Sequence, residues 1–262
     1  MIKNVLGVFL ACTLLTISSS VVWAQESLLA QQLTNSERPV GDKERDSSRR
    51  PAEVLGFLGI DTGMTVIDVF AGSGYYTEVL AIAVGENGRV ISHNVPRLMS
   101  RETLVESIRA RRDRHPNIEI LVNNLTDGVQ TAEIADIGPH YTDPSAYAGR
   151  ADAAITALNM HDFVRNGEES AQSLLTSVYA FLKPGGIFGV IDHRGVDGYD
   201  NEALHRITDE ELREQLLKAG FVVDAESDIL SNPLDDHSLH MRDESLGRNT
   251  DRILVRARKP AQ

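Results

Sequence analysis

The side chains best suited to proton transfer form two short clusters in the second half of the chain. His161 and Asp162 make up the first, and Asp192, His193 and Arg194 the second. A histidine titrates near neutral pH and can accept a proton from a nucleophile. The candidate catalytic residues are therefore His161, Asp162 and His193. The structural alternatives are that Asp162 caps a helix with His161 packed beneath it, and that His193 joins a hydrogen-bond cluster at a strand end, with Arg194 pairing to Asp192 or Asp162.

A second type of site is indicated by Gly72-Ser73-Gly74, which follows an apolar run containing Asp68. Glycines there let the backbone approach a ligand and present amide groups at a helix N-terminus. The spacing excludes three common motifs. A dinucleotide fingerprint would need glycine at Thr77, a phosphate-binding loop would need Gly-Lys-Ser/Thr, and a nucleophile elbow would need a residue between the serine and each glycine.

A polar loop at residues 231–251 contains Asp235, Asp236, His237 and His240, whose side chains suit several divalent ions. Their spacing matches no established ligand pattern, so we interpret the loop as solvated and assign no metal. A metal-assisted hydrolase stays open as an alternative, and it would use His161, Asp192, His193 and the loop around His237.

The elements that would position these residues alternate between strand and helix. Apolar, β-branched runs predict strands at 65–70, 89–92, 117–122, 151–158, 187–192, 221–225 and 253–258. Amphipathic patterns predict helices at 51–58, 75–84, 100–113, 168–182 and 208–220, the fourth followed by a turn at 183–186. Ser100 and Thr208 are the expected caps of the third and fifth helices. This alternation predicts a parallel sheet covered on both faces, which binds ligands beyond the carboxyl ends of its strands.

The segment 66–74, Val-Ile-Asp-Val-Phe-Ala-Gly-Ser-Gly, resembles the first motif of class I S-adenosylmethionine-dependent methyltransferases. Asp152, at the fourth strand, and Leu-Lys-Pro-Gly-Gly at 182–186 are also typical of that family, and the resemblance covers 51–259. Within it, the segments around His161, His193, His205 and His237 are similar to a little-characterised exported subgroup. The resemblance implies an α/β, Rossmann-like three-layer fold, a mostly parallel seven-stranded sheet whose last strand is antiparallel, and S-adenosyl-L-methionine as cofactor.

The resemblance also implies roles for single residues. The strand acid orders the loop and the methionine end of the cofactor, the glycines approach it, the end of the second strand meets the ribose, and the end of the third meets the adenine. Phe70 stands where the family often has a glycine, and Asn94 and Asn123-Asn124 replace the usual acids. The expected cofactor-binding residues are Asp68, Phe70, Gly72, Ser73, Gly74, Asn94, Asn123 and Asn124. Tyr75 and Tyr76 either line the cofactor site or pack in the core, and His205-Arg206 either closes over the site or is structural.

The first 24 residues have the pattern of a secretory signal peptide: Lys3, an apolar run at 5–17 and a small-residue exit ending at Ala24. We expect cleavage after Ala24, a periplasmic or secreted location, no stable membrane span thereafter, a polar arm at 25–50 and one methyltransferase-like domain at 51–262. Cys12 is the only cysteine, so the mature chain has no disulfide.

The charge of the chain argues against nucleic acid as a partner. The formal net charge is −12, and removing Lys3 leaves −13, which repels phosphate backbones. The one basic run, at 109–114, is expected to be a solvated helix end. The resemblance implies an S-adenosylmethionine-dependent methyltransferase, and with nucleic acid disfavoured we expect a small or medium-sized substrate. The alternative is a catalytically silent binding protein on the same fold, favoured by the replaced cofactor contacts and by export.

Overall fold

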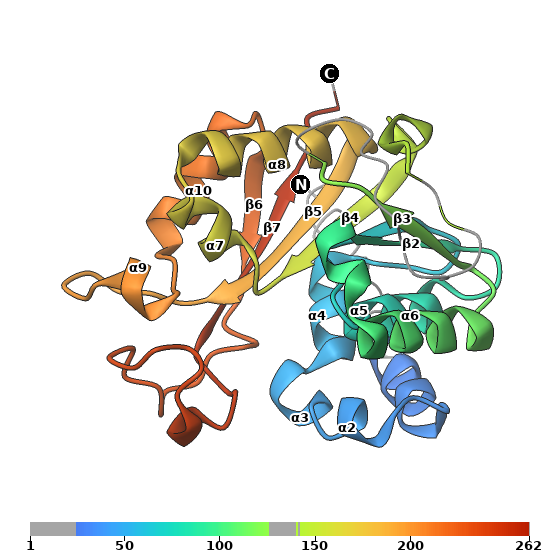
Figure 1. Cartoon of the computed structure of the whole chain (residues 1–262), viewed down its shortest axis with the longest axis horizontal. Coiled ribbons are helices and arrows are strands. Elements are labelled where there is room, and N and C mark those ends of the chain that lie inside the picture. The colour runs from blue at the N-terminus through green and yellow to red at the C-terminus, as the bar shows by residue number, and fades with distance from the viewer. Residues whose placement is uncertain (1–24, 126–139, 141, 262) are drawn as a thin grey trace, which may run out of the picture.

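The computed structural model describes residues 25–125, 140 and 142–261, so the predicted signal peptide lies outside the described residues. Its centre is a seven-stranded sheet in the order β3-β2-β1-β4-β5-β7-β6 (Figure 1). All neighbouring pairs are parallel except those of β7, which runs antiparallel to β5 and β6. The predicted fold class is confirmed. The strands are β1 Thr65–Val69, β2 Arg89–Asn94, β3 Ile118–Val122, β4 Ala151–Ala157, β5 Leu182–His193, β6 Val222–Glu226 and β7 Arg252–Arg258.

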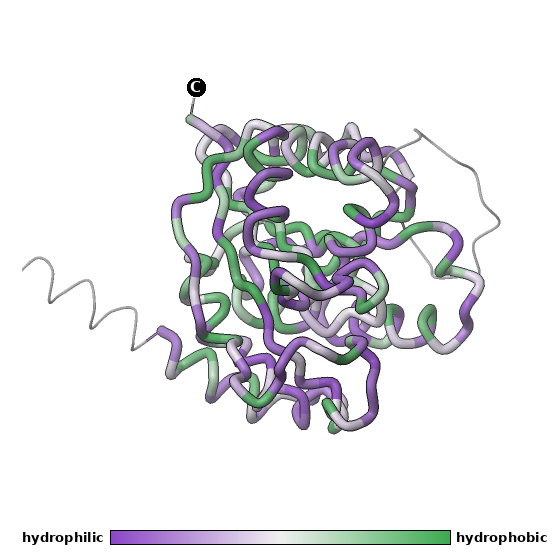
Figure 2. The backbone as a smooth tube through the Cα atoms, turned by 90° about the vertical axis from the view of Figure 1, so that its left-hand side faces the viewer, coloured by the Kyte–Doolittle hydropathy of each residue, from purple (hydrophilic) through white to green (hydrophobic). Residues whose placement is uncertain are grey.

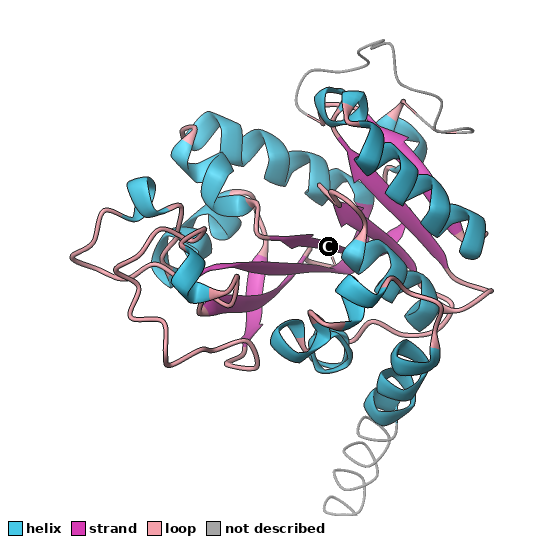
Figure 3. Cartoon of the chain, turned by 60° about the horizontal axis from the view of Figure 1, so that its bottom comes forward, coloured by secondary structure: helices cyan, strands magenta, loops and turns pink. Residues whose placement is uncertain are grey.

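Two layers of helices cover the sheet because alternate strand residues point to opposite faces. Ile67 and Val69 of β1 enter one core, which α7, α8 and α10 complete, whereas Val66 enters the core beneath α4 and α5. Figure 3 shows helices on both sides of the magenta sheet, and in Figure 2 hydrophobic stretches run through the interior. The longer helices are α4 Pro51–Leu58, α5 Tyr75–Val84, α6 Glu102–Arg114, α7 Met160–Arg165, α8 Glu168–Phe181 and α10 Asp209–Lys218.

The predicted polar arm is largely helical and packs on the domain. Residues 25–35 form a helix whose Leu29 and Leu33 are buried in the core beneath α4. Two short helices follow, α2 Val40–Lys43 and α3 Asp46–Arg49. Arg252 of β7 donates to the carbonyl of Ser48 at 3.0 Å. Among the described residues, no helix has the length and apolar character needed to cross a membrane.

Two local predictions are wrong. Helix α6 begins at Glu102 with Arg101 at its N-cap, because Ser100 ends the preceding 3-10 helix, Pro96–Ser100, and its hydroxyl donates to the carbonyl of Arg97. The expected turn at 183–186 lies inside β5 as a bulge, since the pairing with β4 passes from Ala151–Leu182 to Ala153–Ile187. The remaining short elements are η2 Pro144–Tyr147, α9 Asn201–Leu204 and η3 Glu244–Leu246.

The capping box at Thr208 is confirmed. Its hydroxyl accepts from the backbone of Glu211 at 3.1 Å, and the Glu211 carboxylate accepts from the backbone of Thr208 at 2.9 Å. The candidate cofactor residues and the pair His161 and Asp192 lie where β1 to β5 end, at one edge of the parallel part of the sheet.

Candidate functional site

Asp68 ties the first strand to the helix that follows. Its carboxyl is 3% exposed and accepts from the Thr77 hydroxyl at 2.6 Å. The Ser92 hydroxyl lies 3.0 Å from the Thr77 hydroxyl, so the hydrogen bonds continue from Asp68 through α5 to β2. Burial raises the pKa of Asp68 to about 7, although the hydrogen bonds from Thr77 act in the opposite direction. Asp68, which the resemblance implies orders the glycine loop, is therefore linked to that loop through Thr77 of α5.

The two glycines of the loop differ in their surroundings. Both adopt left-handed backbones, with φ of 58° at Gly72 and 88° at Gly74. A Cβ on Gly72 would meet nothing within 4 Å, whereas one on Gly74 would lie 2.9 Å from Cδ of Arg111. The N-cap of α5 is Gly74, which has no side chain to cap the helix. Gly72 therefore faces open space beside a helix N-terminus, a suitable environment for a carboxylate or other anion.

Phe70 adopts a left-handed conformation, φ 56°, which explains why a glycine is common at this point of the motif. Its amide donates to Nδ1 of His93 at 3.2 Å. Its ring centroid lies 4.9 Å from those of His93 and Phe163. Burial lowers the pKa of His93 to about 4, so this imidazole is neutral. Phe70 joins the loop to α7, the helix that carries His161.

Asn94 contacts the loop through both ends of its amide. Its Oδ1 accepts from the Gly72 amide at 2.9 Å, and its Nδ2 donates to the Gly72 carbonyl at 3.1 Å. The side chain is fully buried. An aspartate could make only the first bond, because a carboxylate has no donor. The amide at this position therefore supports the shape of the loop.

At the end of β3, the Asn123 side chain is likewise hydrogen-bonded within the protein. Asn123 is buried, accepts from the amide of Leu125 at 3.1 Å and donates to the carbonyl of Thr142 at 3.3 Å. Its own carbonyl lies 3.0 Å from Nε2 of His93. Asn124 beside it is half-buried. The adenine contact predicted for these two asparagines stays a prediction.

Tyr75 and Tyr76 pack against the arm. The Tyr75 hydroxyl donates to Asp46 at 2.6 Å, and the guanidinium of Arg49 lies 4.3 Å from its ring centroid and 5.9 Å from that of Tyr76. Both rings are at most 5% exposed. These contacts fit the packing alternative for the two tyrosines.

Arg111 corrects our interpretation of the basic run. Its side chain is 4% exposed, and it pairs with Glu78 and, at 2.7 Å, with Asp42 of the arm. Its Nε donates to the carbonyl of Ser73 at 2.7 Å. The basic run is therefore not simply a solvated helix end. Arg111, on α6, connects the glycine loop, Gly72-Ser73-Gly74, to α5 and to the arm.

The second group of polar residues is built on Asp192, at the end of β5. Its carboxylate accepts from the backbone amide of His161 at 2.9 Å and from Nδ1 of the same residue at 2.6 Å. Both side chains are at most 1% exposed. Since a carboxylate accepts only, the proton lies on Nδ1 and the lone pair on Nε2. Burial lowers the pKa of His161, but Asp192 more than offsets this and raises it.

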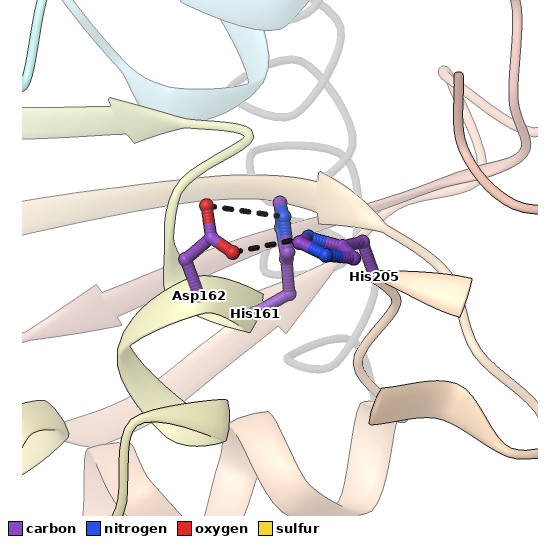
Figure 4. A group of neighbouring side chains, drawn as sticks. All are labelled: His161, Asp162 and His205. Carbon is purple, nitrogen blue, oxygen red and sulfur yellow. Dashed lines mark ion pairs between the residues drawn. The ribbon is translucent and has the colours of Figure 1, made fainter. Parts of the chain in front are cut away.

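Nε2 of His161 is buried and has no hydrogen-bond partner among the described residues. It lies 3.7 Å from Oδ2 of Asp162. Nδ1 of His205, also without a hydrogen-bond partner, lies 3.1 Å from Oδ1 of the same aspartate. Figure 4 shows the three side chains pointing toward one another, two from α7 and one from the segment after α9. We call these three residues the His161 cluster.

His193 and the polar loop are engaged elsewhere. Nδ1 of His193 lies 2.6 Å from the Thr250 hydroxyl, and burial lowers its pKa to about 3. His237 pairs with Asp251 at 3.0 Å. Among the described residues, the histidines and acids that could share a metal are those of the His161 cluster. The grouping of His161, His193 and His237 does not form.

Two assignments need revision or addition. Arg194 pairs with Asp209 at 3.2 Å and Asp251 at 3.3 Å, so the predicted pairing with Asp192 or Asp162 is wrong. Sequence reasoning missed Asp192 as the partner of His161. A signal existed, because adjacent strands β4 and β5 must end side by side, and Ala157 pairs with Ile191.

Comparisons with known proteins agree with this geometry. A family model described as protein-L-isoaspartate(D-aspartate) O-methyltransferase matches residues 18–134. A S-adenosylmethionine-dependent methyltransferase structure from Aquifex aeolicus is 19% identical over 86% of this chain and 100% of its own, with a TM-score of 0.54. The [4+2]-cyclase SpnF is 16% identical over 82% and 81%, with a TM-score of 0.55. A possible exported protein from Bordetella parapertussis is 16% identical over 83% and 68%, with a TM-score of 0.50. No curated protein sequence matches the chain.

Structural likeness at such low identity establishes the fold, and the family match covers β1, β2 and β3 with the glycine loop. The chain therefore shares the fold of S-adenosylmethionine-dependent methyltransferases, and residues 18–134, less than half of its length, match the O-methyltransferase family model.

Proposed function

We propose that this protein transfers the methyl group of S-adenosylmethionine to a small or medium-sized acceptor bound at His161. The observation that carries the proposal is the buried Asp192–His161 pair, whose free Nε2 lies on the helix joined to the glycine loop by the Phe70–Phe163 contact. Asp192 fixes the tautomer and orientation of the imidazole, as the orienting acid does in other catalytic pairs.

The glycine loop fits the cofactor's methionine end, since a Cβ on Gly72 would meet nothing within 4 Å and the N-cap of α5 is a glycine. Asp68 holds this loop through Thr77 and α5. When bound, the cofactor supplies a methyl group on a sulfonium. The acceptor atom takes that methyl group and loses its proton to Nε2 of His161. General-base help of this kind contributes about 10² to 10⁴ in rate.

The family match does not identify the acceptor. It ends at residue 134, before β4, α7 and β5, which carry His161 and Asp192. The isoaspartyl acceptor in the name of that family is therefore not carried over. The residues that we propose meet the acceptor therefore lie outside the family match.

Calorimetric titration of the full chain with S-adenosylmethionine and S-adenosylhomocysteine tests the proposal. We expect binding of both, loss of binding in Asp68→Ala, and no change in the control Asp197→Ala, an exposed loop aspartate. His161→Gln should still bind both ligands. Absence of binding to either ligand by the wild-type chain would contradict the proposal and favour a silent binding protein.

We further propose that residues 1–24 direct export and are removed after Ala24, which places the enzyme in the periplasm or outside the cell. The charge and apolar pattern of the segment support this, as does the description of the Bordetella parapertussis relative as possibly exported. Mass spectrometry of the protein from a periplasmic extract should find Gln25 at its N-terminus. A cytoplasmic protein that retains Met1 would contradict it.

A further inference from the structure

We propose that the His161 cluster binds a divalent first-row transition cation, of which Zn²⁺ is the representative, through Nε2 of His161, Asp162 and Nδ1 of His205. The three potential ligand atoms lie within 4.8 Å of one another. The site goes beyond the proposed function, and its existence does not depend on cofactor binding.

The distances suit a small ion. Two ligands of a tetrahedral zinc at about 2.1 Å are separated by about 3.4 Å. Nε2 of His161 lies 3.7 Å from Oδ2 of Asp162, and Nδ1 of His205 lies 3.1 Å from Oδ1, so the two separations run to different carboxylate oxygens and lie on either side of that value. Small side-chain rotations would therefore complete the site.

The unpartnered nitrogens are the second observation. The His161 side chain is 1% exposed, and its Nε2 has no hydrogen-bond partner. A buried polar atom without a partner costs about 1–3 kcal/mol, and Nδ1 of His205 has no such partner either. Ligation of one cation would satisfy both nitrogens.

The supporting contacts are those found around metal-binding histidines. Nδ1 of His161 donates to Asp192, an arrangement that fixes the metal-binding tautomer. His205 is held by its neighbour Arg206, whose buried guanidinium pairs with Asp235 at 2.9 Å and donates to the Leu239 carbonyl. Asp162 is 41% exposed, which leaves a route from solvent.

Two imidazoles and one carboxylate favour zinc, manganese, iron or cobalt over magnesium and calcium, which prefer oxygen ligands. Three protein ligands leave a coordination position open. If the proposed function holds, an acceptor oxygen at that position would lose its proton more readily. His161 would then act as a ligand in the cation-loaded protein and as the base in the cation-free protein.

Arg165 competes with a cation, because its guanidinium pairs with Oδ1 of Asp162 at 3.1 Å. Removing this charge should strengthen cation binding. That expectation separates a metal site from a merely structural cluster, in which loss of Arg165 would have no effect on metal affinity.

The test is titration of the chelator-stripped full chain with Zn²⁺ against a chromophoric chelator, supported by the visible spectrum of the Co²⁺-loaded protein. We expect one equivalent per chain, about 100-fold weaker binding in His205→Gly, and about 10-fold to 100-fold weaker binding in Asp192→Asn. Glycine is chosen because His205 has a φ of 53°. Arg165→Gln should bind several-fold more tightly, and the control His237→Ala should match the wild type.

Failure to bind stoichiometric Zn²⁺ would overturn the proposal, as would a His205→Gly variant that binds like the wild type. Loss in His237→Ala alone would place the ion on the polar loop and would also overturn it. These outcomes are independent of the cofactor titration, so failure of the cation site and failure of the proposed function are distinguishable.

Discussion

The glycine loop and the His161 cluster lie at the same edge of the sheet but satisfy their polar groups differently. Around the loop, Asp68, Asn94 and Arg111 all bond to other parts of the protein, and the N-cap of α5 is a glycine without a capping side chain. In the cluster, two buried ring nitrogens have no hydrogen bond from any residue that the structure describes. The first region uses its side chains to hold a shape, whereas the second keeps side-chain lone pairs for a ligand, at a cost in stability.

Removing Arg111 should produce the largest loss of stability. Arg111→Met leaves the buried Glu78 and Asp42 without this partner, and we expect the free energy of unfolding to fall by about 3 kcal/mol. Urea unfolding measures the change. Arg109→Met, a half-buried arginine of the same helix, is the control and should change it by no more than about 0.5 kcal/mol. Equal losses in both variants would show that the clamp contributes nothing.

The pH dependence of stability should reveal the buried His93. The pKa of His93 is about 4 in the folded chain and about 6.5 when unfolded, so the unfolded state takes up the proton first on acidification. The free energy of unfolding should fall between pH 6.5 and 4, by up to about 3 kcal/mol. Urea titrations across this range should show a flatter profile in His93→Gln.

Asp68 should change the pH dependence of stability in the opposite direction. Its folded pKa of about 7 lies above the ordinary 3.8, so its contribution is present at low pH and is lost as the pH rises from 3.8 to 7. Asp68→Asn should therefore make the loss of stability on acidification steeper. Identical slopes in the wild type and both variants would contradict the assigned burial of these groups.

Asn94→Asp tests whether the end of β2 serves the loop or the ribose. The carboxylate loses the donor to the Gly72 carbonyl, so we expect about 1–3 kcal/mol less stability and weaker S-adenosylhomocysteine binding by calorimetry. Asn87→Asp, in an exposed turn, is the matched control. A gain in affinity would mean that this position faces the ribose.

His205→Gly should have the smallest effect on stability. Glycine accepts the left-handed backbone at this position, φ 53°, without strain, and the substitution removes a nitrogen that has no hydrogen bond. We expect the free energy of unfolding to stay within about 1 kcal/mol of the wild type or to rise. A loss comparable to that of Arg111→Met, in the same urea assay, would mean that the cluster is structural.

Much of the fold was predictable because its signals are local. Apolar β-branched runs marked the strands, and helix α5 has the bounds 75–84 that its pattern predicted. The cap at Thr208 was also recognised from its spacing to Glu211. Such signals arise from interactions within a few residues, which a single sequence displays directly.

The contacts of the site were less predictable because they join distant segments. Arg111 meets Glu78 and the arm residue Asp42 across three elements, and nothing near Arg111 in sequence distinguishes it from the other arginines of the run. Asn94 was identified as a departure from the family, but its partner, the Gly72 backbone, depends on the register between β1 and β2. His205 reaches Asp162 only through the anchoring of Arg206.

Hydrogen–deuterium exchange with S-adenosylhomocysteine tests most directly whether the glycine loop is the cofactor site. We predict that the ligand slows amide exchange most strongly within residues 70–77, where Gly72 faces open space and the N-cap of α5 is a glycine. Zn²⁺ alone should slow exchange instead within residues 160–165 and around His205. Protection by S-adenosylhomocysteine that spares residues 70–77, or none at any peptide, would contradict the account.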